Sequence, residues 1–320
     1  TEISRKNVKG FLSFRTQNPP PRTPSMNDTK PISIEQQLEN LPPLPITVAN
    51  VLAVTNNPES SANDLVKAIL PDQTMCVAVL KIANSALYGR PKKVDSLETA
   101  VAFLGFDEVQ NIVLAKAAVQ VFHPIFKTYE HDLNTFWDHS FTCGLAARII
   151  GEHLGLPSGQ FFAAGLLHDI GKLAMLLAFG KRYDTAQWLI GITTKEQLAT
   201  EKELFSTTHD LVGSRLLQHW QFPDNLIIAV RHHHPSGTPG QLQEFPLVIQ
   251  LADFLAHMHL VPEKPDEHDL KAALDSTLPG FFEQWRELQL PWEDITLESL
   301  FAWVKIDREN GNGILDILAL

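Results

Sequence analysis

The stretch FFAAGLLHDIGKLAMLLAF, residues 161–179, decides how this chain folds. It is apolar over nearly its whole length and is long enough to suggest a membrane span. However, His168, Asp169 and Lys172 lie near its centre, and a charge at the middle of a bilayer costs several kcal/mol. We therefore predict a buried helix over residues 160–179 and no membrane span.

Helical spacing continues on both sides of this stretch. Apolar residues recur every three or four positions, and no strand-like alternation with hairpin turns interrupts them. About five helices are predicted upstream of residue 130, and those that follow cover residues 135–153, 160–179, 183–191, 208–219, 224–234 and 246–259. The fold class predicted from this pattern is all-α, with a helical N-terminal subdomain packed on a helical C-terminal subdomain.

Breaks in composition divide the chain into four predicted parts. The N-terminal part contains the proline-rich stretch NPPPRTPS at residues 18–25, which cannot continue a helix. The C-terminal part has enough apolar residues to pack on the core. The parts are a flexible arm and linker at 1–35, an N-terminal helical half at 36–130, a second helical half at 131–260, and a C-terminal helical extension at 261–320.

The charge and the cysteine count exclude several classes of protein. The formal net charge of −11 repels phosphate backbones, and the densest basic group is only Arg90, Lys92 and Lys93. We therefore predict no nucleic-acid partner. Two cysteines, Cys76 and Cys143, offer no disulfide framework, which favours the reducing cytoplasm.

The second helical half carries a set of histidines and aspartates on apolar helix faces. His139 shares a stripe with Cys143 and Ile150, and an aspartate in a segment as apolar as that around Asp169 needs a partner. Neutral imidazole and carboxylate are the expected ligands of Fe, Mn, Zn or Ni. The candidate metal ligands are His139, His168, Asp169, His209, residues within the run His232–His234, and Asp253.

Two residues of this set also have candidate catalytic roles. Asp169 could bridge two ions, and two ions a few ångströms apart stabilise the attacking and leaving oxygens of a phosphoester hydrolysis. Lys172 could hold a phosphate oxygen or neutralise the cluster. The structural alternative is that each inward histidine is a core residue, and that the histidine run caps a helix C-terminus. His219, His257 and His259 are predicted to lie on the surface.

Several segments resemble known families. GLLHDIGKL at residues 165–173 resembles the signature of the HD superfamily of metal-dependent phosphohydrolases, and the order of the histidines and aspartates is similar to that of the HD-GYP cyclic-di-GMP phosphodiesterases. LPPLP at 41–45, VLKIANSALYG at 79–89 and ETAVAFLGFDEVQNIVL at 98–114 resemble the N-terminal half of the HDOD domain. The resemblance covers about residues 38–260 and implies a helical, HD-type bacterial signal-transduction output domain.

The resemblance also shows where this chain departs from the enzymes. It reads PSGTPG after the histidines instead of the GYP segment, and Thr135 stands where three-metal HD-GYP enzymes carry a glutamate, which argues against a third ion. The alignment of the histidine run is ambiguous by one residue, and we prefer His233 and His234, with His232 as the alternative.

Two main hypotheses follow for the function. The favoured one is a regulatory or scaffolding module of the HDOD type that contacts a signalling protein and carries an HD-like metal site. The other is a metal-dependent phosphohydrolase or phosphodiesterase that acts on a nucleotide or cyclic dinucleotide. A nucleotide-binding sensor without turnover is a third, weaker alternative.

Overall fold

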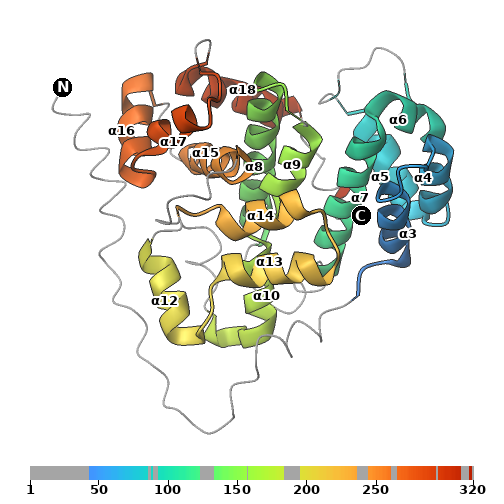
Figure 1. The fold of residues 1–320 in the computed structure, drawn as a ribbon, viewed down its shortest axis with the longest axis horizontal. Helices are drawn as coiled ribbons and strands as arrows, with labels where there is room; N and C mark the ends of the chain where they lie inside the picture. The colour runs from blue at the N-terminus through green and yellow to red at the C-terminus, as the bar shows by residue number, and fades with distance from the viewer. Residues whose placement is uncertain are drawn as a thin grey trace, which may run out of the picture.

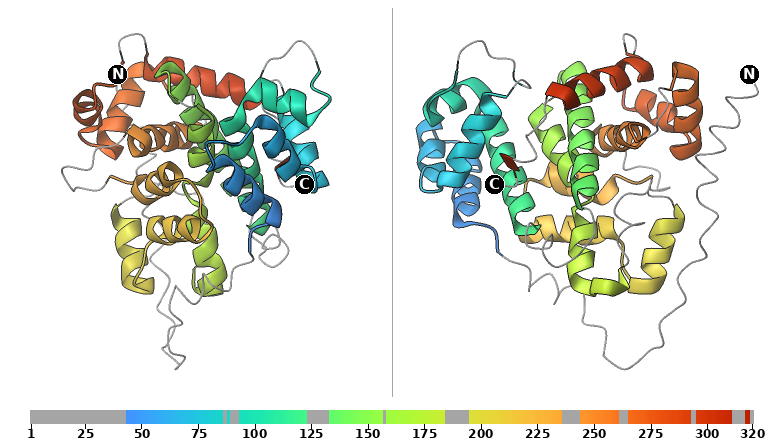
Figure 2. Two further views of the ribbon diagram at one scale, coloured as in Figure 1. Left: turned by 45° about the vertical axis from the view of Figure 1, so that its right-hand side comes forward. Right: turned by 180° about the vertical axis from the view of Figure 1, so that it is seen from behind.

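All regular structure described for this chain is helical. The computed structural model describes residues 43–85, 88, 93–122, 133–156, 158–183, 195–235, 244–260, 265–292, 295–310 and 317–318. Within these ranges no strand occurs, so the predicted all-α fold class is confirmed (Figure 1). The N-terminal helices form one group beside the remaining helices, as the views from the other sides also show (Figure 2). The predicted N-terminal arm lies outside the described residues.

Within the described residues, five helices make up the N-terminal group. Ser61 begins the second of them with a capping box, and Ser96 begins the fourth by accepting a hydrogen bond of 3.1 Å from the Thr99 N–H. The last helix is buried along most of its length and packs against the second group. The five are α3 (Ile46–Thr55), α4 (Ala62–Ile69), α5 (Gln73–Ala83), α6 (Leu97–Leu104) and α7 (Phe106–Phe122).

The second group follows most of the predicted helices. Its elements are α8 (Leu133–His153), α9 (Ser158–Leu167), α10 (Ile170–Phe179), the short 3-10 helix η3 (Gly180–Arg182), α12 (Lys195–Phe205), α13 (His209–His219), α14 (Asp224–His232) and α15 (Glu244–Met258). The sequence pattern did not predict α12. Apart from Tyr183, which ends η3, the helix predicted over residues 183–191 lies outside the described residues.

The prediction of a single helix over residues 160–179 is wrong in one respect. The helix is interrupted at His168 and Asp169, so that it forms two helices, α9 and α10. The spacing of apolar residues does not reveal such a break, because the helices on both sides of it are apolar. The stretch Ser158–Phe179 is long and apolar enough to cross a membrane by length and composition, and 89% of its most apolar window is buried inside the protein. That burial is typical of a core helix.

The C-terminal helices are α16 (Glu267–Thr277), α17 (Phe281–Glu287) and α18 (Leu297–Asn310). Of these, α18 packs on α8 of the second group, in agreement with the predicted packing on the core, and α16 packs on α18. Two ion pairs fasten α18 to α8, Arg148 to Asp307 at 2.8 Å and Arg308 to Asp138 at 2.6 Å. Residues 317–318 contact α7, where the buried Lys116 Nζ lies 3.4 Å from the Ile317 carbonyl oxygen.

His259, which directly follows α15, is expected to make the stability of the metal-free protein fall with acid. Its ring stacks on Phe301 at 4.0 Å, and burial lowers its pKa from 6.5 to about 4, with a further contribution from Arg308. The unfolded chain takes up a proton near pH 6.5 and the folded ring only near pH 4, so stability is lost between these values as pH falls. Because the ring is partly exposed, the loss from pH 7 to pH 5 is roughly 1 kcal/mol.

Urea unfolding at pH 7 and pH 5 measures this loss. The variant His259→Phe should lose less stability between the two pH values than the parent. His219→Phe, at an exposed histidine of α13, should behave as the parent does. An identical pH dependence in the parent and His259→Phe would contradict the prediction. The partial burial of His259 also corrects its predicted surface position, whereas His219 is exposed as predicted.

Candidate metal centre

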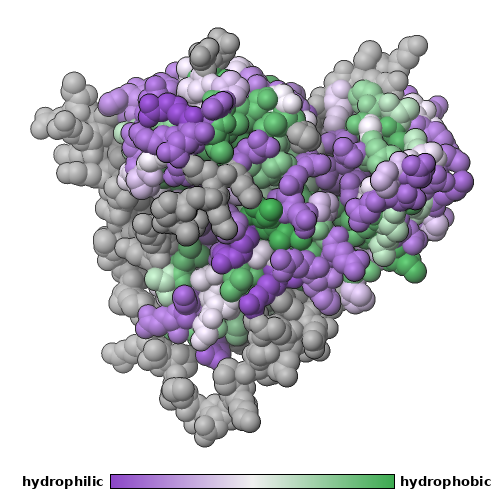
Figure 3. All heavy atoms as spheres, in the orientation of Figure 1, coloured by the Kyte–Doolittle hydropathy of each residue, from purple (hydrophilic) through white to green (hydrophobic). Residues whose placement is uncertain are grey.

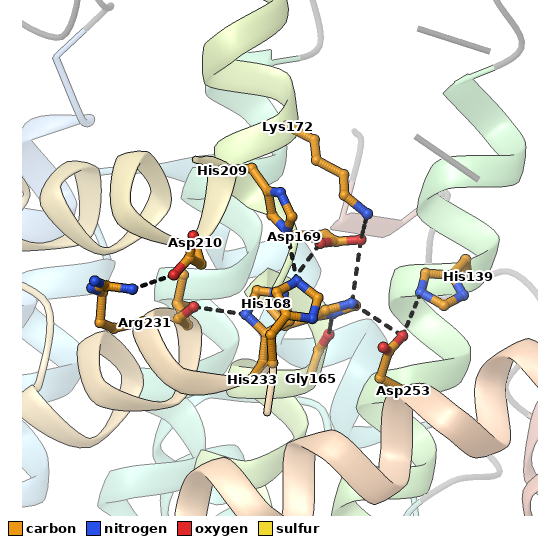
Figure 4. A network of polar contacts seen from close by, with 12 residues as sticks. His139, Gly165, His168, Asp169, Lys172, His209, Asp210, Arg231, His233 and Asp253 are labelled. Carbon is orange, nitrogen blue, oxygen red and sulfur yellow. Dashed lines mark hydrogen bonds and ion pairs between the residues drawn. The ribbon is translucent and has the colours of Figure 1, made fainter. Parts of the chain in front are cut away.

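The helices of the second group bring the predicted ligands together in the interior. His139 comes from α8, His168 and Asp169 from the break between α9 and α10, and Asp253 from α15 (Figure 4). His209 is the first residue of α13, and His233 directly follows α14. All the predicted histidine ligands are buried, and the side chain of Asp253 is 15% exposed. The convergence expected from the sequence is therefore present.

The break between α9 and α10 places two adjacent side chains at the same centre. In a continuous helix neighbouring side chains point about 100° apart. Here Asp169 has φ −99° and ψ 9°, outside regular helical values, and its carbonyl accepts a hydrogen bond of 2.9 Å from the Lys172 N–H. His168 and Asp169 can consequently both face the ligands that come from the other helices.

Asp169 lies at the middle of the cluster. Its Oδ1 is 3.4 Å from His209 Nε2 and 3.4 Å from His233 Nε2. Its Oδ2 is 3.4 Å from His168 Nε2 and 2.6 Å from Lys172 Nζ. The two carboxylate oxygens thus face different histidines, which is the arrangement that a bridging ligand needs.

Asp253 forms the other side of the cluster. Its Oδ1 lies 3.1 Å from His139 Nε2, 3.5 Å from His168 Nε2 and 3.0 Å from His257 Nδ1. The surface position predicted for His257 is therefore wrong, since the ring is only 5% exposed and faces the cluster. Its spacing of four residues from Asp253 places both on one face of α15, a signal that the sequence did contain.

The histidine run is divided between the cluster and the surface. His234 Nε2 lies 2.8 Å from His209 Nε2, and His233 contacts Asp169. His232, the alternative ligand, ends α14 and is partly exposed, and it belongs to none of the donor groups found among the described residues. The geometry thus favours the pair His233 and His234.

The donor atoms of the cluster fit a cation. Buried polar atoms nearly always have hydrogen-bond partners, because leaving one unpaired is costly. Here six buried atoms without one come from the cluster: His139 Nδ1, His139 Nε2, His168 Nε2, Asp169 Oδ1, His233 Nε2 and Asp253 Oδ1. Three overlapping groups have donor atoms within 4.8 Å of one another, namely Asp169–His209–His233–His234, His139–His168–Asp169 and His139–Asp253–His257.

Backbone carbonyls fix how two of the rings are protonated. His168 Nδ1 lies 2.7 Å from the Gly165 carbonyl oxygen, and His233 Nδ1 lies 2.7 Å from that of Val230. A carbonyl can only accept, so in the neutral form of each ring Nδ1 carries the hydrogen and Nε2 has its lone pair for a cation.

Comparison with known proteins agrees with this geometry. The HDOD domain family matches residues 41–236, more than half of the chain. The chain belongs to the HDOD family. The HDOD match includes the N-terminal helices and every predicted ligand except Asp253, which lies further along on α15.

Solved HDOD-like structures share the fold. An HDOD domain protein of unknown function from Geobacter sulfurreducens has a TM-score of 0.66 and 23% identity, over 90% of this chain and 100% of that chain. A candidate phosphohydrolase from Shewanella amazonensis SB2B also has a TM-score of 0.66, with 22% identity over 89% of this chain and 98% of that chain. At these identities the likeness supports the fold alone.

A curated relative extends beyond this HDOD chain. An uncharacterized protein of Treponema pallidum is 24% identical over 282 residues, which are 84% of this chain and 51% of the relative. The chain therefore spans about half of that relative's length.

Glu201 of α12 is a part of the centre that sequence patterns do not reveal. It is fully buried, and its carboxylate accepts hydrogen bonds of 2.8 Å from His209 Nδ1, 2.9 Å from the His209 backbone N–H and 2.9 Å from the Tyr183 hydroxyl. It lies in the charged segment KEQLATEKELF, residues 195–205, which is typical of an exposed helix face. Glu201 thus orients His209 and directs its Nε2 to Asp169.

Replacing Glu201 with glutamine is expected to weaken metal binding by about 10- to 100-fold, because the carboxylate that orients His209 is lost. Competition with a chelating dye measures the affinity. Glu203→Gln changes an exposed glutamate of the same helix and should leave the affinity unchanged. Equal affinities in the two variants would contradict the role given to Glu201.

The electrostatics of this HDOD centre favour the ligand form at neutral pH for Asp169 and for three of its histidines. Burial lowers the pKa of His139 to about 4, and burial also lowers the pKa of His233 and His234. For Asp169, burial is outweighed by Lys172 and then by His168, which together hold its pKa well below the usual value. For His168, burial is outweighed by Cys143 and then by Asp169, which hold its pKa above the usual value. Asp169 and the other three histidines are thus in the forms that a metal requires, whereas His168 must release a proton when it binds one.

Proposed function

We propose that this protein is a bacterial signal-transduction module of the HDOD type whose His/Asp centre binds divalent transition-metal ions. The observation that carries the proposal is the set of six buried polar atoms that face one another without hydrogen-bond partners. The abundance of imidazole favours Fe, Mn, Zn or Ni over Mg or Ca.

Each residue has a role in this proposal. His209, His233 and His234 would hold one ion with Asp169, and His139, His168 and Asp253 would hold a second with the other oxygen of the same aspartate. Lys172 holds the Asp169 carboxylate in place through its contact at 2.6 Å.

Contact with a signalling protein partner is the second element of the proposal. Apolar residues reach the surface over the N-terminal helices (Figure 3). Three of them are well exposed, Ile46 at 78%, Leu70 at 60% and Val77 at 47%. Exposed apolar side chains that lie on neighbouring elements support a surface for partner binding.

Elemental analysis of the protein purified without chelators tests metal binding. We expect about one to two equivalents of a transition metal per chain, released by prolonged dialysis against a strong chelator. A content below about a tenth of an equivalent, with no uptake of added Mn, Fe or Zn, would overturn the proposal.

A second candidate function is hydrolysis of a phosphoester of a nucleotide or cyclic dinucleotide. The specific observation in its favour is that Asp169 presents its two oxygens to two donor groups. Two ions held so would stabilise the attacking and leaving oxygens of the ester. Lys172, buried at the same carboxylate, carries the positive charge that could hold a phosphate oxygen.

A panel of substrates separates the two functions. The metal-loaded protein is assayed with bis-p-nitrophenyl phosphate, nucleoside monophosphates and cyclic dinucleotides. Saturable turnover that disappears on metal removal would support the hydrolase. Full metal loading without turnover on any substrate would reject the hydrolase and leave the metal-binding signalling module in place.

A further inference from the structure

His257 has surroundings that its apolar helix face alone does not explain. Its ring centroid lies 4.3 Å from that of His139, and its Nδ1 lies 3.0 Å from Asp253 Oδ1. The ring is only 5% exposed, and burying its polar nitrogens is unfavourable unless they have hydrogen-bond partners or bind a cation. These two neighbours, His139 and Asp253, belong to the centre, and three of their buried atoms lack hydrogen-bond partners: both ring nitrogens of His139 and Oδ1 of Asp253.

The hydrogen bond of His257 has the same pattern as those of two predicted ligands, His168 and His233. Its Nδ1 lies 2.9 Å from the Asp253 backbone carbonyl, as the Nδ1 atoms of His168 and His233 lie against carbonyls of their own segments. In the neutral ring the hydrogen is therefore on Nδ1, and Nε2 keeps a lone pair.

That hydrogen bond alone does not make a ligand. His153 of α8 has an equivalent contact of 2.8 Å with the Ile149 carbonyl, yet it stacks on Trp303 away from the centre. What distinguishes His257 is its donor group, since one ring nitrogen of His257, one of His139 and a carboxylate oxygen of Asp253 lie within 4.8 Å of one another. His153 is consequently a matched control.

We propose that His257 is a further ligand of the ion held by His139 and Asp253, an inference that rests on the proposed metal-binding function. The family resemblance gives the ligand order only as far as Asp253, so this donor is inferred from the structure and not from the resemblance. With His257 the second ion has the donor group His139–Asp253–His257 in addition to His168 and Asp169. An imidazole-rich set of this kind favours a transition metal over Mg or Ca.

Cobalt substitution tests the proposal without any assay of activity. A histidine bound to paramagnetic Co(II) through Nε2 retains its Nδ1–H, which gives a strongly shifted, solvent-exchangeable proton NMR signal. We compare the parent with His257→Gln and His153→Gln at saturating Co(II), and we determine the Co(II) content of each sample. Glutamine can still donate to the Asp253 carbonyl, so it keeps the orienting contact and removes the imidazole.

The expected result is the loss of one shifted signal in His257→Gln and of none in His153→Gln. Loss of the whole second equivalent of Co(II) in His257→Gln also supports a ligand, because the orienting contact is retained. Unchanged signals and Co(II) affinity in His257→Gln would overturn the inference. If that variant does not fold, His257→Asn replaces it.

The two proposals fail in different ways. A parent protein without any shifted signal at saturating Co(II) would sink the metal-binding function itself. Shifted signals that persist through substitution of His257 would sink only the role of this residue.

Discussion

Alanine at position 169 is expected to remove both equivalents of bound metal. Asp169 is the acceptor that the two donor groups share, with Oδ1 facing His209 and His233 and Oδ2 facing His168. Without the Asp169 carboxylate, neither donor group has an anionic ligand at position 169. We therefore expect the metal affinity to fall by at least about 100-fold. Elemental analysis after loading with Mn or Zn measures the loss.

The same substitution is expected to destabilise the metal-free protein by about 3–5 kcal/mol, because it leaves Lys172 buried without its carboxylate partner. Guanidinium unfolding measures this, and adding Lys172→Met should restore part of the stability without restoring metal. Asp224→Ala removes an exposed aspartate of α14 and should change neither property. Full metal occupancy in the Asp169→Ala variant would show that the centre is organised differently.

Gly171→Ala is the second change with a large expected effect. A Cβ atom at Gly171 would lie 1.8 Å from the His209 carbonyl oxygen and 2.7 Å from the Gly213 nitrogen. Both neighbours are backbone atoms of α13, so α10 and α13 must move apart. We expect a loss of about 3 kcal/mol or more, at the upper end of overpacking effects, together with weaker metal binding because His209 is displaced.

Urea unfolding and Zn titration measure both effects. The control is Ala178→Gly, which removes a methyl group from the partly exposed end of the same helix and should cost about 1 kcal/mol or less. A Gly171→Ala protein as stable as the parent, with normal Zn affinity, would mean that α10 and α13 do not approach each other in this way.

The sequence allowed the centre to be predicted where its residues lie on apolar helix faces. Periodicity placed His139 and Asp253 inward, and the apolar segment around Asp169 indicated that this carboxylate needs a partner. Their convergence is confirmed by the structure. The all-α class followed from the same spacing, because a period of three to four residues is visible without any knowledge of tertiary contacts.

Other features depend on contacts that periodicity does not encode. The break between α9 and α10 lies in a uniformly apolar stretch. Glu201 is buried only because α12 folds back against His209, while its neighbours in sequence are charged and exposed. The predicted surface position of His257 overlooked its spacing from Asp253, which places both residues on one face of α15.

The spread of the ligands over α8, the α9–α10 break, α13, α14 and α15 has a consequence for unfolding. A cation held there acts as a non-covalent cross-link between segments that are remote in the chain, and the unfolded chain cannot form it. Its contribution to stability grows with the logarithm of the free metal concentration, about 2.7 kcal/mol at a hundred times the dissociation constant. The melting temperature of this protein would then report the metal supply around it.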